Sequence, residues 1–408
     1  MGELSLSRLW VLMVTAFVDL VGFALVLPLL PIYADEMGAS PSIIGILLAA
    51  FAFSQLITGP MWGRLSDRIG RRPVILAGQF LSAIAFLVFA AADSVWLLLL
   101  SRLAQGAGGG TLSANHAYVA DSVQPEQRAE ALGWITACTS AGVMVGPAIG
   151  SFSVRWGDHV PGLIAATFCL LNMFFAWRWL PESSKKTNRP PPVYRSLRHH
   201  IGEIVRHPSP PVHALIWIYA AGMLAFMAVS GLMSLYLADR FGITKETIGG
   251  FYVALGALSV VMRALILGRL VRWLGEVRVL RLGILALIVG LAATPLANGP
   301  IQFLLLMLFV PLGTSLLFPS TTSLISRHSR PDEIGQTHGV QQAFGGTSRL
   351  LAPIWAGFAY EHAGAATPFW IAAGIVLFTL LFSLRLHPGE APRRSAPEVE
   401  VELPSSTG

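Results

Sequence analysis

Long apolar runs separated by short polar clusters make up most of the chain. A transmembrane helix needs about 20 mostly apolar residues. Runs of that length recur here and break at polar or Gly/Pro clusters such as DEMGAS, ANGP and EHAGAATP. The pattern therefore predicts an all-α membrane protein with twelve spans. These are residues 8–33, 42–62, 73–92, 95–120, 131–154, 160–180, 211–238, 247–267, 279–297, 300–325, 337–361 and 367–386.

One long polar stretch divides the predicted spans into two sets of six. It covers residues 182–210, is basic and is rich in Pro. We therefore predict an N-terminal six-helix bundle over residues 1–181, a cytoplasmic linker over 182–210 and a C-terminal six-helix bundle over 211–387. The remaining residues, 388–408, are predicted to form a disordered cytoplasmic tail.

Three landmarks recur in the two halves at the same spacing to within one residue. GRLSDRIGRRPVI at residues 63–75 corresponds to GRLVRWLGEVRVL at 268–280. VQPEQRAEALG at 123–133 corresponds to SRPDEIGQTHG at 329–339, and Pro147 corresponds to Pro353. A shared spacing indicates duplication of a six-helix unit. Two parallel repeats around an axis along the membrane normal form a known transporter architecture, with the substrate site between them.

Composition and charge support this interpretation. The chain is 54% hydrophobic and 12% charged, whereas soluble domains are about 25% charged. With both termini in the cytoplasm, most of the 28 Lys and Arg residues fall on the cytoplasmic side, and only Arg155, Arg240 and Lys245 fall outside. The net charge of +6 then needs no nucleic-acid partner. We expect a monomeric multi-pass protein of a bacterial cytoplasmic membrane, in contact with lipid.

Among the acidic residues, Asp19 alone sits deep in a predicted span. An ionised carboxylate at mid-membrane costs at least about 2.5 kcal/mol, and acids in such places are by default functional. Burial favours its neutral form, so Asp19 could take a proton from one side and release it to the other. The alternative is a polar residue that only holds neighbouring helices together.

Three arginines also lie within predicted spans. Arg263 sits about one turn from the cytoplasmic end of the eighth span, where its side chain can reach the interface. Arg102 lies early in the fourth span and should face a cavity or a partner, unless it reaches out to the interface. A direct pair with Asp19 stays open. Arg349 lies in the middle of the eleventh span. It could bind an anionic substrate group, pair with Asp19 or hold helix contacts.

Two segments suggest moving parts. In GRLSDRIGRR, Gly63 and Gly70 permit a tight turn, and Asp67 and Arg71 are spaced to meet on a helix face. The fifth span carries small residues four positions apart, which allow close helix approach, and a proline that can kink it. These residues are Gly142, Gly146, Pro147 and Gly150.

Together these motifs resemble the major facilitator superfamily, in its drug:H⁺ antiporter branch. GRLSDRIGRR (63–72) is similar to the family's loop motif, RLAQGAGGG (102–110) to its fourth-helix motif and GVMVGPAIG (142–150) to its antiporter motif. FVDLVGFALVLPLLP (17–31) is similar to the first helix of the tetracycline-exporter-like subgroup. The resemblance covers nearly the whole chain and implies the major facilitator fold.

The resemblance also implies roles for residues. It gives Arg102 a part in proton transfer. It implies that Asp67 sits against the start of helix eleven and joins Arg71 and Asp121 in a cytoplasmic gate that favours the outward-open state. The gate motif also contains Arg68 and Arg72, and the alternative is that these arginines only set topology. Tetracycline exporters carry further acids in helices three and nine, which spans 73–92 and 279–297 lack.

The substrate cavity is predicted from residue type and span. Aromatic, Met and amide side chains suit loosely specific apolar ligands. With Arg349, the candidates are Phe23, Gln55, Met223, Phe226, Tyr252, Gln341 and Gln342.

We expect proton-coupled efflux of small amphipathic molecules by alternating access. An uptake symporter or metabolite exporter of the same fold is one alternative, since fold does not fix function. A non-transporting membrane sensor or assembly partner is another. No P-loop, nucleophile elbow or metal-ligand spacing was found, so no enzyme activity, cofactor or metal is expected.

Overall fold

The computed structural model describes residues 6–109, 128–180, 211–330 and 333–384, with single positions at 118, 182, 202, 204, 206 and 386. Within these residues the chain is helical and contains no strand. The predicted linker falls almost wholly outside the described residues, and the predicted tail, 388–408, does so completely. Asp121 also lies outside them.

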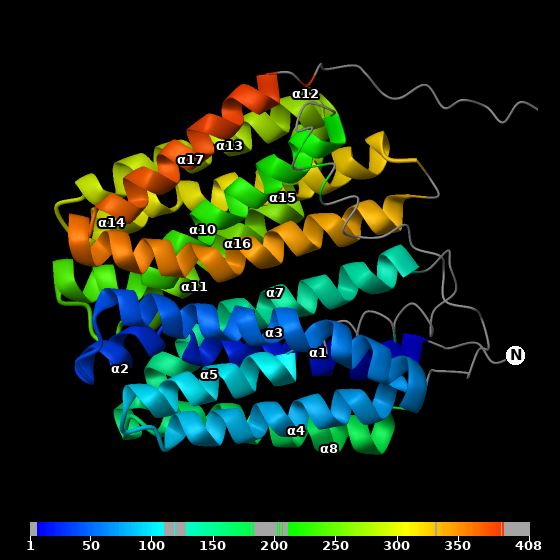
Figure 1. Cartoon of the computed structure of the whole chain (residues 1–408), viewed down its shortest axis with the longest axis vertical. Coiled ribbons are helices and arrows are strands. Elements are labelled where there is room, and N and C mark those ends of the chain that lie inside the picture. Colours follow the sequence, from blue (N-terminus) through cyan, green and yellow to red (C-terminus); the bar gives the residue numbers. More distant parts are fainter. Residues whose placement is uncertain are drawn as a thin grey trace, which may run out of the picture.

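The helices run side by side along one direction, in two groups (Figure 1). The group that precedes residue 181, here called the first half, comprises α1 (Leu6–Val26), α2 (Leu30–Glu36), α3 (Pro41–Ile69), α4 (Arg71–Ala90), α5 (Val95–Gly109), α7 (Arg128–Ser153) and α8 (Val160–Trp179). The group that begins at Pro211, the second half, comprises α10 (Pro211–Phe241), α11 (Ile248–Val261), α12 (Leu267–Leu274), α13 (Glu276–Ala293), α14 (Pro300–Met307), α15 (Phe309–His328), α16 (Ile334–Ala363) and α17 (Thr367–Leu384).

Nine described helical segments are long and apolar enough to cross a membrane, and Ile248–Val261 is a shorter apolar helix. Three predicted spans are interrupted in the structure, and one of them, the tenth, divides into α14 and α15 at Leu308. The first divides into α1 and α2 around Pro28, which has no backbone N–H to donate. The eighth passes through one wide helical turn, Met262–Ile266, before α12 begins.

The two ends of the helical bundle carry different features, and each end is named here after its feature. At the turn end, which carries Gly70 and Gly275, helices α3 and α4 and helices α12 and α13 are each joined by a single glycine. These glycines have φ of +104° and +77°, a backbone region that other residues rarely adopt. The clamp end, defined by Glu36, Asp158 and Lys245, lies at the opposite ends of the helices.

The two halves touch toward the clamp end. A Cβ added at Gly45 of α3 would lie 2.2 Å from the carbonyl oxygen of Pro353 in α16, so the two backbones are in direct contact. Gly249 of α11 approaches the carbonyl oxygen of Pro147 in α7 in the same way. Toward the turn end, an added Cβ at Gly335 or Gly339 of α16 would meet nothing within 4 Å among the described residues.

Candidate functional site

Asp19 lies inside the first half and points toward α4 and α8. Gln79 of α4 donates a hydrogen bond to its Oδ1. Asn172 of α8 donates to the same oxygen at 2.7 Å and to the Thr15 carbonyl at 3.1 Å. Gln79 and Asn172 are 4% and 1% exposed. The carboxylate is thus held by neutral amides, which stabilise it without supplying a counter-charge.

Arg102 does not pair with Asp19. Its guanidinium lies over the ring of Phe89, 5.2 Å from the centroid, and the side chain is 2% exposed. Its Nη2 atom is buried with no hydrogen-bond partner, and no ion pair of Arg102 is present in the described part of the chain. Asp19 and Arg102 therefore belong to separate polar environments, and the direct pair left open by the sequence is not formed.

The antiporter motif packs against the helix that carries Asp19. Added Cβ atoms at Gly142, Gly146 and Gly150 would lie 2.7, 2.8 and 2.2 Å from backbone oxygens of α1. The opposite side of α7 meets the second half, because Gly249 approaches Pro147 and Ser151. Helix α7 therefore links α1 to the second half through close backbone contacts.

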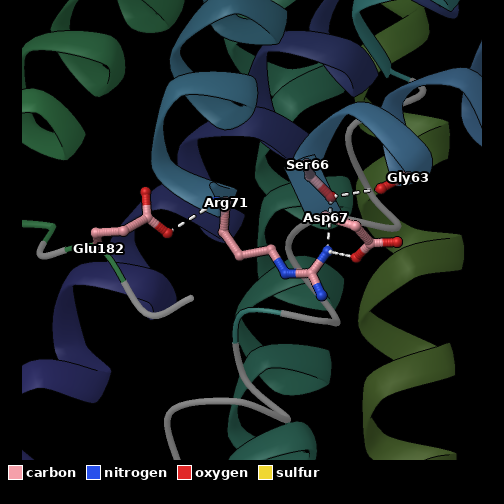
Figure 2. A network of polar contacts seen from close by, with 5 residues as sticks. All are labelled: Gly63, Ser66, Asp67, Arg71 and Glu182. Atoms are coloured by element: carbon pink, nitrogen blue, oxygen red, sulfur yellow. Dashed lines mark hydrogen bonds and ion pairs between the residues drawn. The ribbon is translucent and has the colours of Figure 1, made fainter. Parts of the chain in front are cut away.

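The loop motif is more helical than the sequence suggested. Gly63 lies within α3, where its carbonyl accepts the Ser66 hydroxyl at 2.8 Å, and only Gly70 forms the turn. Arg71 binds Asp67 at 2.6 Å and Ser66 at 2.7 Å (Figure 2). The Asp67 side chain is 66% exposed, and no contact between it and α16 is present among the described residues. Arg68 is exposed, and Arg72 donates to the carbonyl of Trp177.

Glu182 supports this turn and was not anticipated from the sequence. Its Oε1 accepts the backbone N–H of Arg71 at 2.8 Å (Figure 2). Its Oε2 accepts the backbone N–H of Arg72 at 3.1 Å. A carboxylate at the start of a helix satisfies free N–H groups and interacts favourably with the helix dipole. Glu182 therefore caps α4 from the segment that follows α8.

The second copy of the motif uses a different partner. Glu276 begins α13 and binds Arg327 of α15 at 3.1 Å and the Ser323 hydroxyl at 2.8 Å. Its side chain is 12% exposed. The acid of the second copy therefore joins α13 to α15 within the second half.

The predicted cavity residues fall into two groups. Gln341 is buried and hydrogen-bonded to Thr322 and His338, Tyr252 is bonded to Ser234, and Met223 is buried. Gln342 is exposed. Residues at intermediate burial are Phe23, Gln55, Phe226, Tyr252 and Arg349. The Phe23 ring lies 5.0 Å from that of Phe51 at a tilt of 42°. Gln55 donates to the Gly109 carbonyl, and Phe226 lies beside Phe318.

Arg349 stands at the centre of α16, about 22 Å from either end of the helix. Its charge acts on Tyr219 of α10, whose hydroxyl interacts with Gln342. No ion pair of Arg349 is present in the described residues. Gly346, three residues earlier, faces Leu56 of the first half. Arg349 therefore lies on α16 near the face shared by the two halves.

Lys245 joins the halves at the clamp end. This residue follows α10, and its ammonium binds Glu36 at 2.9 Å and Asp158 at 2.8 Å, both in the first half. The ammonium also lies 5.2 Å from the ring centroid of Tyr33. Burial lowers the pKa of Lys245, but its hydrogen bonds with Asp158 and Glu36 outweigh burial and raise the pKa above its ordinary value. A second contact joins Glu361 of α16 to the Ser42 N–H at 3.0 Å.

Comparison with known proteins identifies the family. The sequence profile of the Major Facilitator Superfamily matches residues 12–353 and 275–407. The chain belongs to this family. As a family member with apolar helices of spanning length, it is a multi-pass protein of the cell membrane. The family consists of transporters and is not an enzyme class.

Individual relatives match over most of their length. Multidrug resistance protein 2 of Bacillus subtilis is 27% identical over 86% of this chain and 88% of the relative. The class C tetracycline resistance protein of Escherichia coli is 29% identical over 93% of this chain and 97% of the relative. A mutant of the nucleoside transporter NupG superposes with a TM-score of 0.78 at 14% identity, covering 93% of this chain and 100% of that chain. This last similarity confirms the predicted fold.

Proposed function

We propose that the chain exports small amphipathic, drug-like molecules in exchange for protons, by alternating access. The similarity to resistance proteins over nearly the whole chain supports drug efflux. The observation that carries proton exchange is Asp19, an acid within a spanning helix whose contacts among the described residues are neutral amides. Such a group can change its protonation without breaking an ion pair.

The distribution of charge supports an orientation. Arginines cluster at the turn end, and membrane proteins keep such clusters on the cytoplasmic side. We therefore place the turn end and both termini in the cytoplasm and the clamp end outside. Since the halves touch toward the clamp end, the structure corresponds to an inward-facing state in this orientation.

Alternating access then requires the halves to separate at the clamp end and approach at the turn end. Helix α7, packed against both α1 and α11, is the element through which a change at Asp19 reaches the second half. We place the domain boundary in the segment between α8 and α10. The substrate would bind near Gln55, Gln342 and Arg349, with one chain acting as the transport unit.

The direct test is transport by the purified protein in liposomes with an acidic interior and quenched acridine fluorescence. Adding ethidium, a fluoroquinolone or tetracycline outside should release protons and restore fluorescence for at least one compound. Liposomes without protein are the control. Substrate movement in the same direction as protons would indicate a symporter. No movement of any compound or proton would favour the sensor interpretation.

A second test concerns the loop motif. In the inward-facing structure the exposed Asp67–Arg71 pair is a helical i,i+4 pair, worth about 0.3–0.5 kcal/mol and therefore about a twofold effect. If Asp67 also closes the turn end in the outward-facing state, Asp67→Asn should reduce the transport rate at least about fivefold, with normal membrane insertion.

Arg71→Gln and the double variant provide the comparison for Asp67→Asn. If both sites act in one closed contact, the double variant should transport no more slowly than the slower single variant. If Asp67→Asn transports within twofold of the wild-type rate, Asp67 contributes only through its ion pair with Arg71 in the present structure and does not close the turn end.

A further inference from the structure

Within the described part of the chain, the hydrogen bonds of Asp19 use only one of its two carboxylate oxygens. Gln79 and Asn172, from two different helices, both donate to Oδ1. Among the described residues, no side chain donates to Oδ2. A proton bound by this carboxylate would therefore add to Oδ2 without displacing either amide.

Three buried side-chain oxygens on Asp19's two amide donors and on Thr15, one helical turn before Asp19, have no partner in the described chain. They are Thr15 Oγ1, Gln79 Oε1 and Asn172 Oδ1. The three residues are 2%, 4% and 1% exposed. Two of these oxygens belong to the very amides that bind Asp19, so they lie within a few ångströms of it. Buried oxygens of this kind normally accept a hydrogen bond from protein or from water.

Among the described residues, the surroundings of Asp19 contain one further titratable group, the thiol of Cys169. Cys169 lies on α8, near enough for the charge of Asp19 to act on it. Of the other helices packed on α1, α4 presents Gln79 and α7 presents Gly142 and Gly146. None of these described groups places a formal charge beside the carboxylate.

The polar group formed by Asp19, Thr15, Gln79 and Asn172 lies away from the face shared by the two halves. Its residues come from α1, α4 and α8, whereas the close backbone contacts between the halves run through α3, α7, α11 and α16. A substrate held near Arg349 would therefore not touch Asp19. Proton and substrate must then influence each other through helix movement, along the close contacts of α1 with α7 and of α7 with α11.

We propose that Gln79 and Asn172 are positioning residues for the proton. They hold Asp19 through Oδ1, and their carbonyl oxygens, with Thr15 Oγ1, bind the hydronium or water that exchanges a proton with Oδ2. The hydronium gives its proton to Oδ2, leaving water and a neutral acid, and the reverse step returns the proton to water on the other side. This inference rests on the proposed proton exchange at Asp19.

The test uses Asn172→Leu and Gln79→Leu in the liposome assay, across a range of pH. Donation to a carboxylate favours its ionised form, so loss of one donor should move the pH of half-maximal transport upward by about one unit. The KM for the drug should stay within about twofold of the wild-type value, because the polar group around Asp19 does not contact the substrate. Ser320→Ala is the control: Ser320 is equally buried and its oxygen is also unpartnered, but it lies in the second half.

A spectroscopic measurement covers variants that do not transport. The infrared C=O band of protonated Asp19, identified by its loss in Asp19→Asn, should shift in Asn172→Leu and Gln79→Leu and stay in place in Ser320→Ala. Wild-type transport with an unchanged pH profile and an unshifted band in both Leu variants would overturn the positioning role and leave the proposed function intact. A wild type that moves neither drug nor protons would instead overturn the proposed function.

Discussion

Asp19→Asn should abolish proton-driven drug transport, with a fall of at least about 100-fold in the liposome assay. Asn can still accept the bonds from Gln79 and Asn172, so the packing of α1 is kept while the exchangeable proton is lost. Exchange of labelled for unlabelled drug in the absence of a proton gradient should persist, because this exchange needs only the movement of the halves.

Asp93→Asn is the matched control for this variant. Asp93 is an exposed carboxylate between α4 and α5, away from Asp19 and its buried neighbours. The Asp93→Asn variant should therefore transport at the wild-type rate. Proton-coupled transport by Asp19→Asn at more than about a tenth of the wild-type rate would show that another group carries the proton.

Gly45→Val should prevent closure of the clamp end. The position of an added Cβ, 2.2 Å from the Pro353 carbonyl oxygen and 3.0 Å from its carbon, leaves no room for a side chain unless α3 and α16 separate. Since close-packed helices cannot absorb such an overlap by small adjustments, the outward-open state should dominate. We expect transport to fall at least about 100-fold.

Labelling at the clamp end tests this directly. In a background carrying Ser42→Cys, Gly45→Val should increase reaction with an impermeant maleimide added outside. Gly59→Val is the control, because it lies on the same helix and an added Cβ there meets nothing within 4 Å. Wild-type transport and labelling by Gly45→Val would show that closure does not depend on this backbone contact.

The sequence predicts the helices well because membrane burial makes their length and apolarity obligatory. It does not predict which helix faces meet. Gln341 and Gln342 were both expected in the cavity, yet Gln341 is fully buried against Thr322 and His338 while Gln342 is exposed. Adjacent residues on a helix point about 100° apart, so only the packing of neighbouring helices decides between them.

The partners of Asp19 were missed for a related reason. They lie 60 and 153 positions away in the chain, and helix periodicity carries no information over such distances. A signal was nevertheless present, because Gln79 and Asn172 are the only amide side chains in spans 73–92 and 160–180. Amides are costly in lipid, so each required a polar partner inside the bundle.

Lys245 was first noted only as an exception to the cytoplasmic bias of basic residues. In the structure its two ion-pair partners, Glu36 and Asp158, have side chains 48% and 61% exposed. Such pairs weaken as dissolved ions increase, because the screening length shrinks from about 10 Å at 0.1 M to about 3 Å at 1 M. Lys245 is charged at neutral pH, and the pKa of its ammonium is raised further by its hydrogen bonds with Asp158 and Glu36. High external ionic strength would therefore weaken the clamp end and increase the population of the outward-facing state in the substrate-free transporter. External salinity would then help to set the conformational equilibrium between transport cycles.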